Sequence, residues 1–164
     1  MDGQQDQTLF NFKAKNIDGQ DVDLSTYKGK AKAFLIVNVA SACGYTDKDY
    51  KELTALYNEL HSKGLEIFAF PCNQFGAQEP KCELDIKKFA TDTYSVKFPL
   101  FSKVDVNGDH SSPLYTWLRS QGKVEKIAWN FSKFLLDRNG KVVAYKKHDQ
   151  SPFSFRNEIE ALLN

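Results

Sequence analysis

Residues 33–70 read AFLIVNVASACGYTDKDYKELTALYNELHSKGLEIFAF, and the fold follows from the pattern of these residues. Residues 33–40 are almost continuously apolar and rich in β-branched side chains, which is typical of a strand buried on both faces. In residues 46–64 apolar side chains recur every third or fourth position, which predicts an amphipathic helix. Residues 65–70 predict a second strand that stops at Pro71. A strand, a helix and a strand in so short a stretch predict a right-handed crossover between parallel strands.

The predicted helix has recognisable ends. Thr46 is expected to be its N-cap residue, because a hydroxyl oxygen can accept a hydrogen bond from a free N–H of the first turn. Gly64 is expected to end it, since glycine readily adopts the left-handed conformation that closes many helices. The side chains on the apolar face are Tyr50, Leu53, Tyr57 and Leu60. Because the preceding strand ends at residue 40 and the helix begins near Thr46, the connection between them is short.

The remaining segments add hairpins and helices. Residues 10–14 and 22–24 alternate apolar and polar side chains around Asp18-Gly19, a type I′ turn signal, and predict an N-terminal hairpin. A second helix after the crossover is marked by Ile86, Phe89 and Ala90. The elements predicted after it are a strand at 98–106, a helix at 113–120, two strands at 131–136 and 141–145 joined by a turn, and a helix at 155–163.

This order of elements, a βαβ half followed by a ββα half, is that of the thioredoxin-like fold. We therefore predict an α/β protein in which helices flank a central mixed sheet, with an added N-terminal hairpin. No repeat or linker interrupts the sequence, so residues 1–164 are expected to form a single thioredoxin-like domain, with residues 1–8 flexible.

Composition narrows the class of protein. The chain has 164 residues, a net charge of +1 and 41% hydrophobic residues, which suits a globular domain and argues against a nucleic-acid partner. Its start is polar and lacks a signal-peptide core, and no apolar run is long enough to span a bilayer. The cysteines number 3, so they cannot all pair within one chain. We therefore expect a cytoplasmic protein in a reducing compartment, without a cofactor or metal ion.

Cys43 stands where the first buried strand ends and the helix begins. Ligands of open α/β sheets bind at this end of the strands, and the free N–H groups of a helix N-terminus favour an anion. We expect the pKa of the Cys43 thiol to fall below its free value of about 8.5, which favours the nucleophilic thiolate. Position 46 is not a second cysteine, which favours chemistry at a single sulfur over dithiol exchange. From position alone, a buried structural cysteine is an equally good interpretation.

Three motifs in the chain resemble those of the glutathione peroxidase family. They are NVASACGYT at residues 38–46, FPCNQFGAQEP at 70–80 and WNFSKF at 129–134, and the resemblance covers essentially the whole chain. It implies a thioredoxin-like enzyme that reduces hydroperoxides. It also implies an active site formed by Cys43, Gln78, Trp129 and Asn130.

These residue types suit peroxide reduction. Attack of the Cys43 thiolate on an O–O bond leaves a sulfenic acid on the sulfur and an alkoxide or hydroxide that needs a proton. Neutral N–H donors from Gln78, Trp129 and Asn130 can stabilise both the thiolate and the developing oxyanion. Removing one such donor in other enzymes costs about 3–4 kcal/mol of barrier. Core packing by the indole and loop capping by the amides are the simpler alternatives for each residue taken singly.

The sulfenic acid must then be reduced, and Cys82 is the candidate resolving cysteine. Family members with a peroxidatic cysteine commonly carry a resolving cysteine in the helix after the Gln-Glu-Pro motif and use thioredoxin, but this helix offers Ala90 instead. Cys82, at the start of the same helix, either resolves the sulfenic acid or is a substitution at a capping position. Cys72 directly follows a buried strand and is interpreted as structural. The reductant implied is a thioredoxin-like protein or glutathione.

The sequence gives no support for tight glutathione binding. Where glutathione-dependent relatives carry basic residues, this chain has Tyr45, Ala128 and Tyr145. Nearby lysines can substitute, although a solvated surface is the simpler interpretation for each of Lys48, Lys126, Lys133, Lys146 and Lys147. The segment between Asn107 and Trp129 lacks the long insertion of tetrameric relatives. We therefore expect a monomer whose open site admits lipid hydroperoxides, with transient contact with the membranes that carry them.

Two functions of other kinds are alternatives to the enzyme. The cysteines and histidines include no closely spaced pair of metal ligands, which argues against a metal site. A peroxide sensor or redox relay would use the same oxidation of Cys43 but pass a disulfide to a partner protein. Turnover with a reductant distinguishes the enzyme from the relay.

Overall fold

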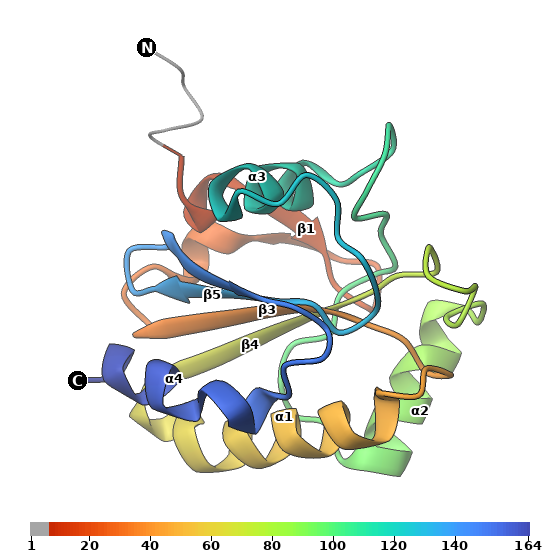
Figure 1. The fold of residues 1–164 in the computed structure, drawn as a ribbon, viewed down its shortest axis with the longest axis horizontal. Coiled ribbons are helices and arrows are strands. Elements are labelled where there is room, and N and C mark those ends of the chain that lie inside the picture. Colours follow the sequence, from red (N-terminus) through yellow and green to blue (C-terminus); the bar gives the residue numbers. More distant parts are fainter. Residues whose placement is uncertain (1–6) are drawn as a thin grey trace.

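The computed structural model describes residues 7–164, and its centre is a four-stranded mixed sheet (Figure 1). The strand order across the sheet is β4-β3-β5-β6. β3 is parallel to β4, whereas β5 is antiparallel to both β3 and β6, so the predicted parallel crossover is confirmed. The strands of this sheet are β3 (Ala33–Val39), β4 (Leu65–Pro71), β5 (Lys133–Asp137) and β6 (Val142–Lys146), and a separate N-terminal pair is formed by β1 (Lys13–Lys15) and β2 (Asp21–Asp23).

Helices cover both faces of the central sheet, as Figure 1 shows. One face, which carries Leu35 and Val37, packs against α1, α2 and α4, and the opposite face, which carries Phe34 and Ile36, packs against α3 and the N-terminal segment. Every residue of β3 and β4 is buried, which explains why their sequences are apolar apart from Asn38 and Glu66. The helices are α1 (Thr46–Leu60), α2 (Glu83–Tyr94), α3 (Pro113–Gly122) and α4 (Arg156–Leu162), and short 3-10 helices lie at Leu9–Asn11, Leu24–Tyr27, His61–Lys63 and Pro152–Phe155.

The predicted N-terminal hairpin is present, but its turn differs from the prediction. The connection between β1 and β2 is a loop over residues 16–20 rather than a two-residue type I′ turn. Such a turn needs positive φ at both central residues, and Gly19 has φ +82° whereas Asp18 has no positive φ. Instead, Asn16 Oδ1 accepts hydrogen bonds from the backbone N–H groups of Asp18 and Gln20. An asparagine side chain therefore closes a wider loop.

The strand predicted at residues 98–106 is wrong, because this segment forms only isolated bridges. The backbone of residues 98–106 hydrogen-bonds partly to β4 and partly to the loop of the N-terminal hairpin. The carbonyl of Pro99 accepts from Ala69 N in β4, and the carbonyl of Leu100 accepts from Ile17 N in the hairpin loop. The apolar pattern that resembled a strand comes from burial between these neighbours and not from a continuous ladder.

At the start of the chain, residues 1–6 lie outside the described residues, and with them most of the segment expected to be flexible. Thr8 is ordered by a capping box: its side chain accepts a hydrogen bond from Phe10 N, and Asn11 Oδ1 accepts one from Thr8 N. Across residues 7–164, no helix combines the length and the apolar character needed to cross a membrane.

Candidate active site

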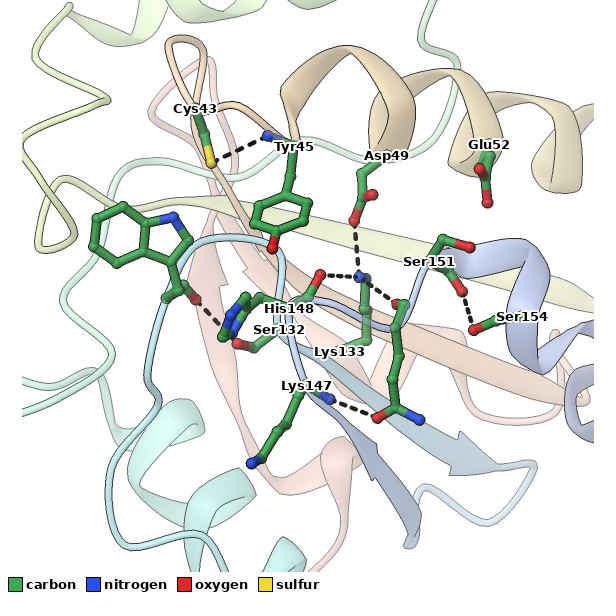
Figure 2. A network of polar contacts seen from close by, with 12 residues as sticks. Cys43, Tyr45, Asp49, Glu52, Ser132, Lys133, Lys147, His148, Ser151 and Ser154 are labelled. Atoms are coloured by element: carbon green, nitrogen blue, oxygen red, sulfur yellow. Dashed lines mark hydrogen bonds and ion pairs between the residues drawn. The ribbon is translucent and has the colours of Figure 1, made fainter.

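Cys43 lies in the tight loop between the end of β3 and the start of α1. It is 9% exposed, so the thiol is buried with a small opening to solvent. The backbone N–H of Tyr45 donates a hydrogen bond to Cys43 Sγ over 3.4 Å (Figure 2). An N–H from the start of a helix favours negative charge on its acceptor. The predicted position of the thiol at a strand-to-helix junction is confirmed.

Thr46 supports this loop in a way that the sequence did not predict. Tyr45, not Thr46, occupies the N-cap position of α1, and it makes no side-chain capping bond. The Thr46 hydroxyl donates to the carbonyl of Ala40 over 2.7 Å and accepts from the backbone N–H of Cys43 over 3.0 Å. Thr46 therefore holds the loop closed from inside, which fixes the backbone that carries the thiol.

A second loop, at residues 73–80, packs against the loop that carries Cys43. The backbone N–H of Ala42 donates to the carbonyl of Gln78 over 3.1 Å, and Ser41 N donates to Glu79 Oε1 over 3.1 Å. Glu79 is fully buried, and burial raises the pKa of its carboxyl group. The motif indicated Gln78 but not Glu79. The structure shows that the Glu79 side chain links the two loops by its hydrogen bond with Ser41 N.

A third segment, at residues 129–132, is held against the end of β3 by Asn38. The Asn38 amide donates to the carbonyl of Trp129 over 3.2 Å, and its oxygen accepts from Ser132 N over 3.2 Å. Phe131 has φ +64°, which is a left-handed backbone conformation and not that of a strand. β5 therefore begins at Lys133, two residues later than predicted. The polar Asn38 within an otherwise apolar strand thus fixes the loop that carries the third motif.

Gln78 and Asn130 meet directly between these segments. Asn130 is buried, and its Nδ2 donates to Gln78 Oε1 over 2.9 Å and to the carbonyl of Phe75 over 3.4 Å. The carboxamide oxygen of Gln78 is therefore occupied, while its Nε2 has no hydrogen-bond partner within residues 7–164. Trp129 is half-buried, with its ring centroid 6.0 Å from that of Phe75. The sulfur itself receives its hydrogen bond from a backbone N–H, a donor that no side-chain motif could indicate.

The other two cysteines differ sharply from each other. Cys72 is buried, and burial raises the pKa of its thiol to about 11, as expected for a structural cysteine. Cys82 is exposed at the N-cap position of α2 and makes no side-chain capping bond. Ala90, on the same helix, is fully buried in the core. The structure therefore offers Cys82, and not position 90, to solvent.

Two of the five candidate lysines depart from the expectation of a solvated surface: Lys133, and Lys146, which is only 15% exposed and pairs with Glu158. Lys48, Lys126 and Lys147 are exposed, as expected. Lys133 is fully buried and forms an ion pair with Asp49. A basic side chain in the third motif is thus a core residue, because a carboxylate on the neighbouring helix compensates its charge. Within residues 7–164, no group of three or more Cys, His, Asp or Glu side chains is arranged to hold a metal ion.

The fold and the site define a thioredoxin-like protein with a single thiol at the start of its first long helix. A thioredoxin-family thiol:disulfide interchange protein from Chlorobium tepidum TLS has the same fold, with a TM-score of 0.68 at 16% identity over 93% of both chains. The crystal structure of GPX1 from T. cruzi matches with a TM-score of 0.77 at 34% identity, over 96% of this chain and 97% of that chain. The predicted thioredoxin-like fold is confirmed.

Sequence comparisons narrow this class to one family. The family model described as glutathione peroxidase matches residues 9–119. A probable phospholipid hydroperoxide glutathione peroxidase from Citrus sinensis is 50% identical over 166 residues, which cover 99% of this chain and 98% of that protein. The chloroplastic phospholipid hydroperoxide glutathione peroxidase 1 of Arabidopsis thaliana is 47% identical over 96% of this chain and 67% of that protein. The chain belongs to the glutathione peroxidase family and is a peroxidase that uses a thiol-type reductant, as its motifs predicted.

Proposed function

We propose that this peroxidase reduces hydrogen peroxide and organic hydroperoxides, including lipid hydroperoxides, through the thiolate of Cys43. The thiolate attacks one oxygen of ROOH, the O–O bond breaks, and Cys43 becomes a sulfenic acid while RO⁻ takes a proton and leaves as ROH. The observation that carries this proposal is the nearly buried thiol at the start of α1 with a backbone N–H on its sulfur. The relatives named for phospholipid hydroperoxides support the lipid substrates.

In this mechanism Gln78 donates to the reacting atoms and Asn130 positions it. Asn130 Nδ2 binds Gln78 Oε1, so the carboxamide of Gln78 is fixed at its oxygen end and its N–H groups stay available. Trp129 supplies an indole N–H from the adjoining loop. Donors fixed before the reaction stabilise the developing oxyanion without reorganising, which is the main source of their effect.

Replacing Gln78 with alanine should slow the oxidation of Cys43 by peroxide by about 10²–10³-fold, the usual effect of removing one oxyanion donor. Asn130→Asp should slow it as well, because a carboxylate at this position cannot donate to Gln78 Oε1. Combining the two changes should add little to the effect of Gln78→Ala, since both act through one amide. Stopped-flow oxidation rates measure this. Wild-type rates in both single variants would show that neither residue takes part.

The oxidised enzyme must be reduced by thiols in two steps. A first thiol condenses with the sulfenic acid to give a disulfide and water, and a second thiol cleaves that disulfide to restore Cys43. We propose that Cys82 supplies the first thiol and that a thioredoxin-like protein supplies the reducing equivalents. Cys82 is exposed beside Leu84, which is 73% exposed, so few apolar contacts hold this turn of α2. The polar contacts of this turn come from Lys103. Its backbone N–H donates to Glu83 Oε2, and its side-chain Nζ donates to the carbonyl of Lys81.

One equivalent of peroxide should therefore give a Cys43–Cys82 disulfide, detected by peptide mass mapping. The two Cα atoms must come within about 7 Å for this bond to form, and opening of the first turn of α2 would let Cys82 move toward Cys43. Cys82→Ser should then lose thioredoxin-supported turnover and accumulate the sulfenic acid of Cys43, whereas Cys72→Ser serves as the matched control and should behave as wild type. Finding no cross-link, together with full thioredoxin-supported turnover of Cys82→Ser, would reject the two-cysteine mechanism.

A steady-state assay with glutathione and thioredoxin side by side tests the proposed function as a whole. Sustained consumption of hydroperoxide with at least one reductant is the expected result. Thioredoxin is expected to be the better reductant, because Tyr45, Ala128 and Tyr145 stand where glutathione-dependent relatives carry basic residues. A single oxidation without turnover, accompanied by trapped mixed disulfides with other proteins, would instead identify a redox relay.

We also propose that the enzyme acts as a monomer that meets lipid hydroperoxides at membrane surfaces only transiently. Light scattering coupled to gel filtration should give the mass of a single chain, 18.7 kDa. Co-sedimentation with vesicles should increase when the vesicles carry lipid hydroperoxides. A stable dimer or tetramer in the scattering experiment would reject the first part of this proposal.

A further inference from the structure

The Lys133 ammonium group is enclosed at the junction of β5, α1 and the segment that follows β6. Lys133 Nζ lies 2.8 Å from Asp49 Oδ2, and the two side chains are 0% and 1% exposed (Figure 2). It also donates to the carbonyl of Gln150 over 2.7 Å and to the carbonyl of His148 over 3.4 Å. A buried ammonium needs such partners for its charge and its donors. One cation thus joins three separate parts of the chain.

Within residues 7–164, the segment held by this cation is attached again only at its far end, where Phe153 N donates to Glu52 Oε1 of α1 over 2.8 Å. His148, Asp149 and Gln150 lie between β6 and the short helix Pro152–Phe155 and are not fully buried. Within the segment, Lys147 N donates to Gln150 Oε1 over 3.0 Å, a local contact that does not attach it to the sheet or to α1. The Lys133 side chain therefore supplies the principal polar attachment of the His148 backbone to the body of the protein.

His148 in turn reaches the site through Tyr45. Their rings lie 5.6 Å apart at an interplanar angle of 66°, an edge-to-face contact. Tyr45 donates its N–H to Cys43 Sγ and accepts a hydrogen bond from Asp49 N through its carbonyl over 2.9 Å. Figure 2 shows the Tyr45 side chain extending from the Cys43 loop toward His148. The two half-buried rings form an aromatic pair, and one of them belongs to the residue whose backbone N–H binds the sulfur.

We propose that Lys133 is a positioning residue of the peroxidase site: paired with Asp49, it holds His148 against Tyr45 so that the two rings form a wall for the organic part of a hydroperoxide. This inference rests on the proposed reaction of Cys43. The wall contacts the R group of ROOH, which hydrogen peroxide lacks. Lys133 therefore sets the selectivity between organic hydroperoxides and hydrogen peroxide, and it does so through the aromatic pair.

The test uses the neutral double variant Asp49→Asn/Lys133→Met, which leaves no unpaired buried charge. The rate of Cys43 oxidation is measured with cumene hydroperoxide and with hydrogen peroxide. The ratio of the two rates should fall about fivefold, the scale of one aromatic contact, while hydrogen peroxide is affected less. A loss of folded protein lowers both rates equally, so this ratio responds to positioning and not to stability. Asp47→Asn/Lys51→Met, which removes an exposed ion pair on the same helix, is the matched control and should keep the wild-type ratio.

Combining Asp49→Asn/Lys133→Met with His148→Ala tests whether Lys133 acts through His148. His148→Ala alone should lower the ratio of the two oxidation rates about as much as Asp49→Asn/Lys133→Met does. Adding Asp49→Asn/Lys133→Met to His148→Ala should lower that ratio no further. An unchanged ratio in Asp49→Asn/Lys133→Met, or a full additional loss in the His148→Ala background, would overturn the inference. Failure of the proposed function looks different, because then neither peroxide oxidises Cys43 in the wild-type protein.

Discussion

Cys43→Ser should lower peroxide reduction by at least about a thousandfold, which is the scale seen when a catalytic nucleophile is removed. A serine hydroxyl is not ionised near neutral pH, so the Tyr45 N–H that binds Cys43 Sγ has no anion to stabilise. The replacement is nearly isosteric and the residue is not fully enclosed, so the fold should persist. Steady-state turnover with saturating reductant, together with stopped-flow oxidation, measures the effect.

Cys72→Ser and Cys82→Ser are the controls for this experiment, because they change the same atom at the two other positions. Cys72→Ser should oxidise as fast as wild type, since burial raises the pKa of the Cys72 thiol to about 11 and keeps it protonated. Cys82→Ser should keep the first oxidation step even if regeneration is lost. Activity of Cys43→Ser within tenfold of wild type would remove Cys43 from the reaction.

The second large effect is expected on stability and comes from the buried ion pair. Asp49→Asn leaves the Lys133 ammonium without a counter-ion, and Lys133→Met leaves a buried carboxylate. Each single change should lower the free energy of unfolding by about 3–5 kcal/mol, because an uncompensated charge stays in the core. Urea unfolding at neutral pH measures both values.

The double variant Asp49→Asn/Lys133→Met should be much less destabilised than either single variant. Burial raises the pKa of Asp49 to about 6 even though Lys133 opposes this shift, so the attraction within the pair does not fully offset the loss of solvation. Removing both charges therefore removes an unfavourable desolvation together with the attraction. The exposed pair Lys51–Asp47 is the comparison, and its loss should change stability far less, because solvent screens its charges. Strictly additive losses at Asp49 and Lys133 would show that the two residues do not stabilise each other.

Local periodicity predicted the fold where burial and secondary structure coincide. The apolar runs at 33–39 and 65–71, interrupted only by Asn38 and Glu66, belong to strands whose residues are all buried. The same reasoning failed at residues 98–106, where buried apolar residues bridge two neighbours without forming a ladder. Burial alone produces an apolar pattern, and only the positions of the neighbours decide whether a strand results.

For the site, the motifs indicated Cys43, Gln78, Trp129 and Asn130 as candidates, because the chemistry expected of each follows from its residue type. Order along the chain was enough to predict a thiol at a strand-to-helix junction and amide side chains in two loops far apart in the sequence. The packing of those loops was needed to show that Asn130 holds Gln78 and that a backbone N–H binds the sulfur. Packing also made Lys133 a core residue. A lysine is solvated unless a carboxylate meets it in the interior, and that meeting depends on how α1 packs on β5, which no local pattern encodes.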